Sequence, residues 1–393
     1  MNWSKSILMA AAFFAATQVQ AQDNLINALK GNVSDNSKEG FKFTEVINLG
    51  RTSIKDQGSS GTCWSYSGNS FLESEMIRMG KDPVEISQIY TARNTYVEKA
   101  KNFVRLHGKQ AQGDGGQLHD VLTIFRKYGA VPYEVYTGLP EGQTRNNFSE
   151  MSPILQSITE SVAKSKKPTA NWLKAFTGAM DSYLGEVPEN FQYKGKTYTP
   201  RTFADQVIGI NPDDYVGISS FEEHELYKPF VLLIPDNWSF ESFYNVKIND
   251  LTDIIDHALS KGYTVAWATD VSEKTFSWKN GVAFVPEKPI EKMTKEEVDN
   301  LFNGPKPEAK ITADQRQAAF DNYETTDDHG MHIVGLVKDQ TGKEYYIVKN
   351  SWGATNDYQG YMYATKEFVR YKTISLMLHK KALDKNMQKQ LGI

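Results

Sequence analysis

Apolar residues recur at helical spacing in four stretches of the chain. This period predicts helices over residues 63–80, 117–128, 151–164 and 251–262. The first of these ends at Gly80, with Pro83 just beyond, which is a common helix stop signal. We expect Cys63 to be its first residue. Gly115 and Gly116 precede the second helix and allow its backbone to come close to whatever lies opposite.

Strand-like patterns gather in the C-terminal third. Alternating or continuous apolar runs occupy residues 263–271 and 281–286, and "EYYIVKNSWG" at 344–353 reads as a strand that enters a turn. Helical patterns thus dominate the part of the chain around Cys63, and strand-like patterns come later. We expect six segments: a signal peptide (1–21), a leader (22–50), a helical subdomain (51–140), a polar insertion (141–250), a sheet or barrel subdomain (251–379) and a tail (380–393).

The first 21 residues have the pattern of an export signal. Lys5 precedes an apolar run from Ile7 to Val19, and small residues lead to Ala21. We expect cleavage near Ala21 and a protein that is periplasmic or secreted. The run is shorter than the roughly 20 residues that cross a bilayer, and no later segment approaches that length. The sequence thus predicts no membrane span.

The net charge limits the class of binding partner, and the cysteine content limits the possible disulfides. The formal net charge is −4, and basic and acidic residues are interleaved. Phosphate binding needs a positive field, so we expect no nucleic-acid partner. Cys63 is the only cysteine, so an internal disulfide is impossible.

The surroundings of Cys63 favour a nucleophile over a buried structural cysteine. It follows the loop "QGSSGT" and stands at a helix N-terminus, where the dipole and unpaired N–H groups lower a thiol's pKa. The loop can bring the side-chain amide of Gln57 to the same point. Two donors that converge on a carbonyl oxygen form an oxyanion hole.

A thiol nucleophile needs a base, and the chain has seven histidines. We predict His332, because it lies in the strand-like run "MHIVGLV" and is followed after 18 residues by Asn350. The amide oxygen of Asn350 would orient the imidazole. Trp352 would shield that hydrogen bond from water.

Three segments, "QGSSGTCWSYS", "GMHIVGLV" and "VKNSWG", resemble the active-site segments of papain-like cysteine peptidases, in the same order. The resemblance implies Gln57 as oxyanion donor, Cys63 as nucleophile, His332 as base and acid and Asn350 as orienter. It also implies that Gly115 and Gly116 line the substrate cleft. It further implies a papain-like α+β fold with a large insertion, in which a helical half and a half built on an antiparallel sheet or barrel have the active-site cleft between them. No cofactor is implied.

Two departures point to one branch of that family. Ser60 stands where secreted papain-like enzymes usually carry a disulfide cysteine, and 269 residues separate Cys63 from His332, against roughly 130 to 150 in the papain type. Both features resemble the bleomycin hydrolase and aminopeptidase C branch. That branch trims residues from peptide N-termini, often as a hexamer, with the end of a C-terminal tail in the cleft. Here only ten residues follow "LHKKAL".

Other readings stay open. Without a tail in the cleft, the enzyme would be an endopeptidase. A binding protein on an inactive peptidase fold is a second alternative. A metal site on Asp327, Asp328, His329 and His332 is a third, because His-x-x-His can place two imidazoles near one ion. Asp270 in "WATDV" is predicted to shape the cleft wall.

Overall fold

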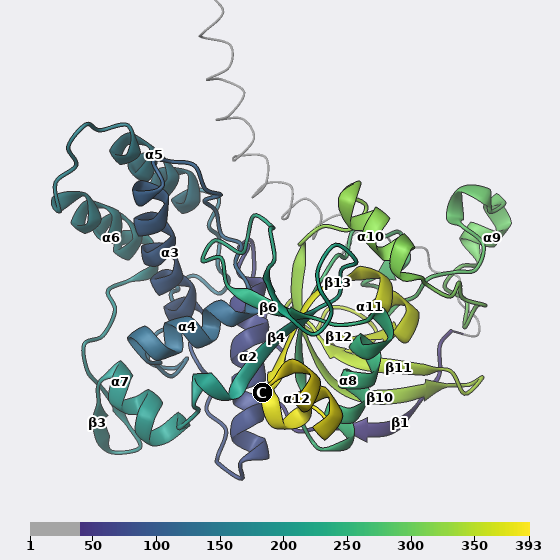
Figure 1. Ribbon diagram of the computed structural model, residues 1–393. Coiled ribbons are helices and arrows are strands. Elements are labelled where there is room, and N and C mark those ends of the chain that lie inside the picture. The colour runs from purple at the N-terminus through teal and green to yellow at the C-terminus, as the bar shows by residue number, and fades with distance from the viewer. Residues whose placement is uncertain (1–39) are drawn as a thin grey trace, which may run out of the picture.

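The computed structural model describes residues 40–393. The predicted export signal and most of the predicted leader lie outside these residues. Figure 1 shows helices α3 to α7 gathered on one side of the molecule and most of the sheet on the other, with α2 between them. Within the described part, no helix is both long and apolar enough to cross a membrane.

Helices dominate the first half of the described chain, and strands dominate the second half. The helices are α2 (Cys63–Arg78), α3 (Gln88–Arg105), α4 (Leu118–Tyr128), α5 (Met151–Ala163), α6 (Asn171–Leu184), α7 (Pro200–Phe203), α8 (Ile248–Ser260), α9 (Lys295–Asp299), α10 (Ala313–Asp321), α11 (Lys366–Lys372) and α12 (Lys385–Leu391). The strands are β1 (Phe43–Asn48), β2 (Phe191–Tyr193), β3 (Lys196–Tyr198), β4 (Tyr215–Ser219), β5 (Pro229–Val231), β6 (Ser242–Asn245), β7 (Val265–Thr269), β8 (Phe276–Ser277), β9 (Val282–Ala283), β10 (His329–Asp339), β11 (Glu344–Lys349), β12 (Tyr361–Thr365) and β13 (Thr373–His379).

The large sheet has β10 near its middle. Its strand order is β5-β6-β4-β13-β7-β10-β11-β12-β9-β8, and β1 pairs with the far end of β10. Nearly all pairs are antiparallel; β4 with β6 and β9 with β12 are parallel. Within residues 40–393 the end strands β5 and β8 do not pair with each other. The predicted α+β class is confirmed, with an open sheet rather than a closed barrel.

The two faces of the sheet carry different helices. Side chains alternate along a strand, so Ala266 of β7 packs into one apolar cluster and Trp267 into another. The first cluster contains Phe71 of α2, and the second contains Leu391 of α12 together with α8. The predicted tail is thus a short helix docked beside α8 (Figure 1), on the face of the sheet opposite to α2.

The segment expected to be an insertion helps to build the main core. Phe176 of α6 and Phe203 of α7 are fully buried in the same cluster as Phe71. Helix α3 was not predicted, although it has 18 residues. Its polar residues, such as Arg93 and Asn94, are buried beside its apolar ones.

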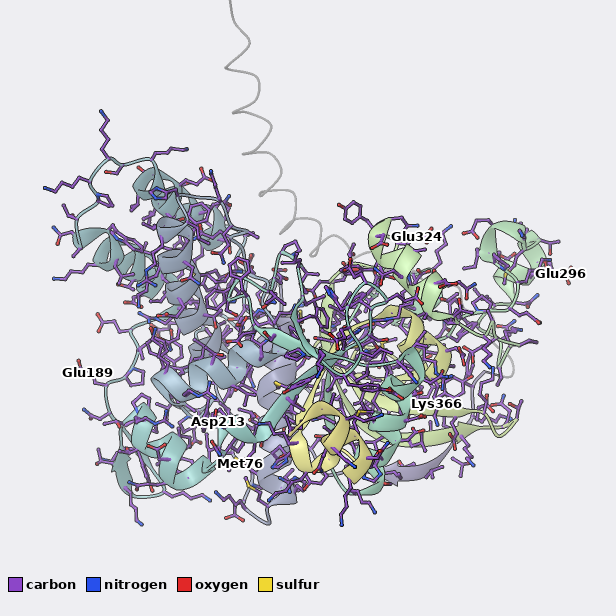
Figure 2. The ribbon with its side chains drawn as sticks, in the orientation of Figure 1. Met76, Glu189, Asp213, Glu296, Glu324 and Lys366 are labelled. Atoms are coloured by element: carbon purple, nitrogen blue, oxygen red, sulfur yellow. The ribbon has the colours of Figure 1, made fainter. Side chains whose placement is uncertain are left out.

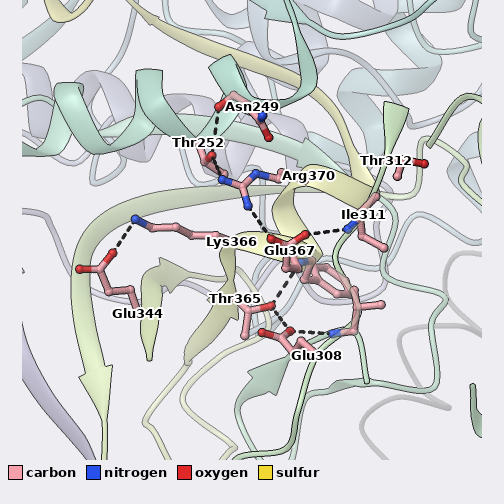
Figure 3. Close-up of polar contacts among 12 residues, drawn as sticks. Asn249, Thr252, Glu308, Ile311, Thr312, Glu344, Thr365, Lys366, Glu367 and Arg370 are labelled. Carbon is pink, nitrogen blue, oxygen red and sulfur yellow. Dashed lines mark hydrogen bonds and ion pairs between the residues drawn. The ribbon is translucent and has the colours of Figure 1, made fainter. Parts of the chain in front are cut away.

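Polar contacts fasten the solvated 286–312 segment to the sheet. Figure 3 shows Lys366 donating to Glu344, and Thr365 donating to Glu308 over 2.7 Å. The backbone N–H of Ile311 donates to Glu367 over 2.9 Å. Figure 2 shows Glu189 and Glu296 on the periphery, whereas Met76 lies within the molecule. Glu189 and Glu296 are exposed, whereas other charged side chains, such as Asp120 and Lys372, are buried.

The shared core predicts one cooperative unfolding transition. Replacing Phe203 with Ala should lower the free energy of unfolding by about 3–5 kcal/mol, because it leaves a cavity next to the core of α2. Guanidinium unfolding followed by tryptophan fluorescence and by circular dichroism measures this. The matched control is Leu233→Ala, at a side chain that is 77% exposed. Two separate transitions in the Phe203 variant would show that the 141–250 segment folds as its own unit.

Candidate active site

Hydrogen bonds within the 57–62 loop hold Cys63 at the start of α2. Ser60 Oγ donates to the carbonyl oxygen of Gln57 over 2.8 Å, and Gln57 Nε2 donates to the carbonyl oxygen of Ser60 over 2.6 Å. Ser351 Oγ, just after β11, donates to Gln57 Oε1 over 2.6 Å. Because Ser60 occupies the position that carries a disulfide cysteine in the family it resembles, these hydrogen bonds fix the loop without a covalent link.

The thiol of Cys63 is not acidic by itself. Burial raises its pKa to about 12, and the nearby carboxylates of Asp236 and Asp327 raise it as well. The backbone N–H groups of Gly330 and Trp64 act in the opposite direction. The helix N-terminus therefore does not overcome burial, and forming a thiolate at neutral pH needs a proton acceptor in the site.

A histidine and an asparagine are paired beside the thiol. His329, the first residue of β10, lines the same pocket as Cys63. Its Nε2 lies 2.7 Å from Asn350 Oδ1, which also accepts from the backbone N–H of Ser351 over 2.7 Å. The fully buried ring of Trp352 packs on the imidazole, with 4.6 Å between ring centroids.

These contacts fix the tautomer of His329. An amide oxygen can only accept, so the hydrogen of the contact belongs to Nε2 of the imidazole. Nδ1 then carries the basic lone pair of the ring. The arrangement can take a proton at Nδ1 while Asn350 keeps the ring in place.

The prediction that His332 pairs with Asn350 is wrong. Strands β10 and β11 run from Lys338 opposite Glu344 in a register that, if continued, would put His332 opposite Asn350. A β-bulge between Ile333 and Gly335 shifts the register by one residue, so His332 pairs with Lys349 instead. Residues after Lys349 then lie alongside those before His332, which brings Asn350 to His329.

His332 belongs to a polar cluster behind α2. Its Nδ1 lies 3.0 Å from Ser70 Oγ, and Lys349 Nζ donates to the same hydroxyl over 2.8 Å. Burial lowers the pKa of His332 well below its ordinary value, and the charges of Lys349 and Arg51 lower it further. An imidazole kept neutral in this way is poorly suited to become the cation that a thiolate requires.

The other predicted site residues have different positions. Gly116 lines the pocket, and Gly115 is covered by Asp236, whose carboxylate occupies the space that a Cβ at Gly115 would need. Trp352 contacts His329 from below the surface and is not among the residues that line the pocket. Asp270 is buried and accepts from the backbone N–H groups of Ser272 and Thr326, so it anchors the turn before His329.

The metal reading finds no support in this geometry. Among the described residues, no group of three or more His, Cys, Asp or Glu side chains is arranged to hold a metal ion. His329 and His332 face different partners, Asn350 and Ser70.

Three acidic residues line the pocket, and the sequence pattern assigns none of them to substrate binding. The residues around it are Cys63, Trp64, Gly116, Leu118, Asp236, Ala268, Asp327, Asp328, His329 and Gly330. The sequence indicates Asp327 and Asp328 only as possible metal ligands. Asp236 comes from the 141–250 segment, and nothing in its local sequence marks it as part of a site.

The comparisons with known proteins agree with this fold. The model of the family described as "Peptidase C1-like family" matches residues 1–392. "Aminopeptidase C" of Lactococcus lactis subsp. cremoris is 23% identical over 416 residues, covering 94% of this chain and 91% of that protein. "Aminopeptidase G" of Lactobacillus delbrueckii subsp. lactis is 23% identical over 404 residues, covering 91% and 88%. A crystal structure of PepW from Lactobacillus rhamnosis superposes with a TM-score of 0.69 at 20% identity, covering 89% of this chain and 84% of that one.

The fold and the site define a papain-like cysteine peptidase. The chain belongs to the Peptidase C1-like family. It is a hydrolase of that class.

Replacing each of the two histidines in turn tests which one accepts the proton of the Cys63 thiol. His329→Ala should lower kcat by about 10³-fold, within the usual range for the loss of a general base. His332→Gln should keep kcat within about tenfold of the wild type and lower the free energy of unfolding by about 1 kcal/mol, from the lost contact with Ser70. Steady-state kinetics on fluorogenic peptides measure both. If His332→Gln lowers kcat more than His329→Ala does, His332 is the base.

Two buried histidines should contribute stability that is lost as the pH drops below about 6.5. Burial lowers the pKa of His332 well below that value and the pKa of His119 to about 3, so both imidazoles take up protons only when the chain unfolds. For these two groups the unfolded state binds more protons, so their contribution falls with falling pH, whereas buried carboxyls with a raised pKa, such as Asp120 and Glu73, act in the opposite direction. Urea unfolding between about pH 5 and 7 should show a free energy of unfolding that rises less with pH for His332→Gln than for the wild type. An unchanged slope would mean that His332 is not buried as a neutral ring.

Proposed function

We propose that the protein is a cysteine aminopeptidase that removes residues from peptide N-termini. The observation that carries the chemistry is the contact of His329 with Asn350 in the pocket of Cys63. The relatives described as aminopeptidases C and G, which match more than nine-tenths of this chain, support the restriction to N-terminal residues.

The reaction begins with proton transfer from Cys63 Sγ to His329 Nδ1. The thiolate attacks the peptide carbonyl carbon, and the electron pair of the C=O bond moves to oxygen. When the tetrahedral adduct collapses, the C–N bond breaks and His329 gives its proton to the leaving amine. Water, deprotonated by His329, then attacks the thioester and releases the N-terminal amino acid.

Gln57 and the start of α2 are the donors we assign to the oxyanion. Gln57 Nε2 carries two hydrogens, of which one is donated to Ser60. The second, together with the backbone N–H of Cys63, would stabilise the negative charge that develops on the carbonyl oxygen. Each such donor is typically worth about 3 kcal/mol in the transition state.

The position of α12 favours one alternative, an endopeptidase. The family resemblance implied a C-terminal tail in the cleft, but Leu391 packs beside α8, on the face of the sheet opposite to Cys63. In this position, Leu391 does not contact a substrate bound at Cys63 of the same chain. Export and a homo-oligomer remain predictions from the sequence.

Two comparisons test the proposal. Cys63→Ala should abolish turnover, with the free energy of unfolding within about 1 kcal/mol of the wild type, because the change removes one small sulfur atom. The wild type should cleave free-amine aminoacyl-coumarins at least about tenfold faster than the N-acetylated compounds, a difference of about 1.4 kcal/mol. Activity that survives in Cys63→Ala would contradict the mechanism. Equal rates on free and acetylated substrates would favour the endopeptidase.

A further inference from the structure

The loop between β5 and β6 brings a carboxylate over the cleft. This loop, residues 232–241, is anchored by Trp238, whose Nε1 donates to Asp120 over 2.8 Å and whose carbonyl oxygen accepts from Gln110 over 2.8 Å. The anchored loop carries Asp236, whose carboxylate rests against the backbone of Gly115. The 141–250 segment thus supplies one wall of the pocket that holds Cys63.

Asp327 stands in the same pocket, close to the catalytic histidine in sequence. Its Oδ2 accepts from Gln117 Nε2, and the negative charge of Asp236 acts on it. Both carboxylates also act on Cys63. They therefore lie within electrostatic range of the sulfur, one on the turn before β10 and the other on the β5–β6 loop.

A further carboxylate, Asp120, lies behind Gly116 and is not among the residues that line the pocket. It is fully buried, and burial raises its pKa to about 7. His119 Nε2 lies 3.6 Å from its Oδ1, but burial lowers the pKa of His119 to about 3, so the imidazole is uncharged. The charge of Asp120 also acts on Asp327.

Within residues 40–393, the charge of Lys99 acts on Asp236 and Asp120 and offsets their charge in part. Its Nζ, however, donates to the carbonyl oxygens of Gly113 and Gly115, over 2.9 and 2.6 Å. Burial raises the pKa of Asp236 and of Asp327, and repulsion from neighbouring carboxylates raises both further. The pocket therefore has an excess of carboxylates that a positively charged ligand would balance.

Cys63 shares one small pocket with Asp236 and Asp327. Its volume is about 10 Å³, which is room for about one water-sized group, so the carboxylates lie close to where a substrate carbonyl meets the sulfur. In a peptide attacked at its first carbonyl, the α-amino nitrogen is two bonds from the reacting carbon, at about 2.5 Å. A free amine is thus brought to this pocket whenever the first peptide bond reaches Cys63.

We propose that Asp236 and Asp327 bind the free α-ammonium group of the substrate and so make the enzyme an aminopeptidase. This inference rests on the proposed cysteine peptidase mechanism. Two internal side chains would then recognise the amine. The family resemblance assigns that role to a C-terminal tail.

The assignment has a consequence for the nucleophile. In the empty site both carboxylates oppose the thiolate of Cys63. A bound ammonium offsets their charge, so the thiolate forms more easily when the correct substrate is in place. An acetylated N-terminus brings no positive charge, and a longer N-terminal extension carries its ammonium group away from this pocket. Free-amine recognition should then appear in kcat as well as in KM.

Asp236→Asn, Asp327→Asn and the double variant test the proposal, because these changes remove charge and keep shape. Each single change should lower kcat/KM for free-amine aminoacyl-coumarins by about 30-fold or more, and leave the slow cleavage of acetylated ones within about threefold. Alkylation of Cys63 by iodoacetamide without substrate should stay at the wild-type rate or rise. The control is Asp82→Asn, at a side chain that is 90% exposed, beyond the other end of α2.

The outcomes separate this inference from the function on which it rests. If the double variant keeps the wild-type preference for free amines, the inference is wrong and the aminopeptidase stands. It is also wrong if alkylation falls in step with hydrolysis, because the carboxylates would then serve the thiol. A variant that lacks Gly392 and Ile393 but keeps both aspartates should retain the preference for free amines. If it loses that preference, the C-terminal tail binds the amine and the inference is wrong. A wild type without Cys63-dependent turnover would instead contradict the proposed function.

Discussion

The close approach of β10 to the first turn of α2 is the constraint on which the site depends. A Cβ at Gly330 would lie 3.1 Å from Trp64 Cα, so the strand meets the helix backbone with no side chain between them. Ser67 Oγ donates to the carbonyl oxygens of both Cys63 and Gly330, which ties the helix to the strand at this point. Because His329 precedes Gly330, this one contact sets the histidine beside the nucleophile.

The rest of the site follows from what flanks this contact. The bulged hairpin of β10 and β11 brings Asn350 to His329, and Trp352 packs beneath both. The 57–62 loop is tied to Ser351 through Gln57. On the open side, the β5–β6 loop adds Asp236 above Gly115. The core thus builds a thiol–imidazole pair, and a loop of the 141–250 segment limits what reaches it.

The sequence predicted the fold class and the position of Cys63 at a helix start because their signals are local. Cys63 follows a Gly/Ser loop and opens a helix with a clear stop signal, and Asn350 lies at the end of an apolar strand. His332 was chosen over His329 because an apolar context marks a strand, and the one-residue bulge that decides which histidine meets Asn350 leaves no local signal. Asp236 lies 173 positions from Cys63 in a polar stretch, so only the tertiary packing of its loop shows its place.

The mechanism requires that His329 make Cys63 reactive, and the pH dependence of Cys63 alkylation by iodoacetamide tests this most directly. In the wild type and in His332→Gln, the rate should already be substantial below pH 8, because His329 takes the proton. In His329→Ala, the rate near pH 7 should fall by about 100-fold or more and should rise only at high pH, as for a buried thiol whose pKa is about 12. The same profile in wild type and His329→Ala would contradict this mechanism.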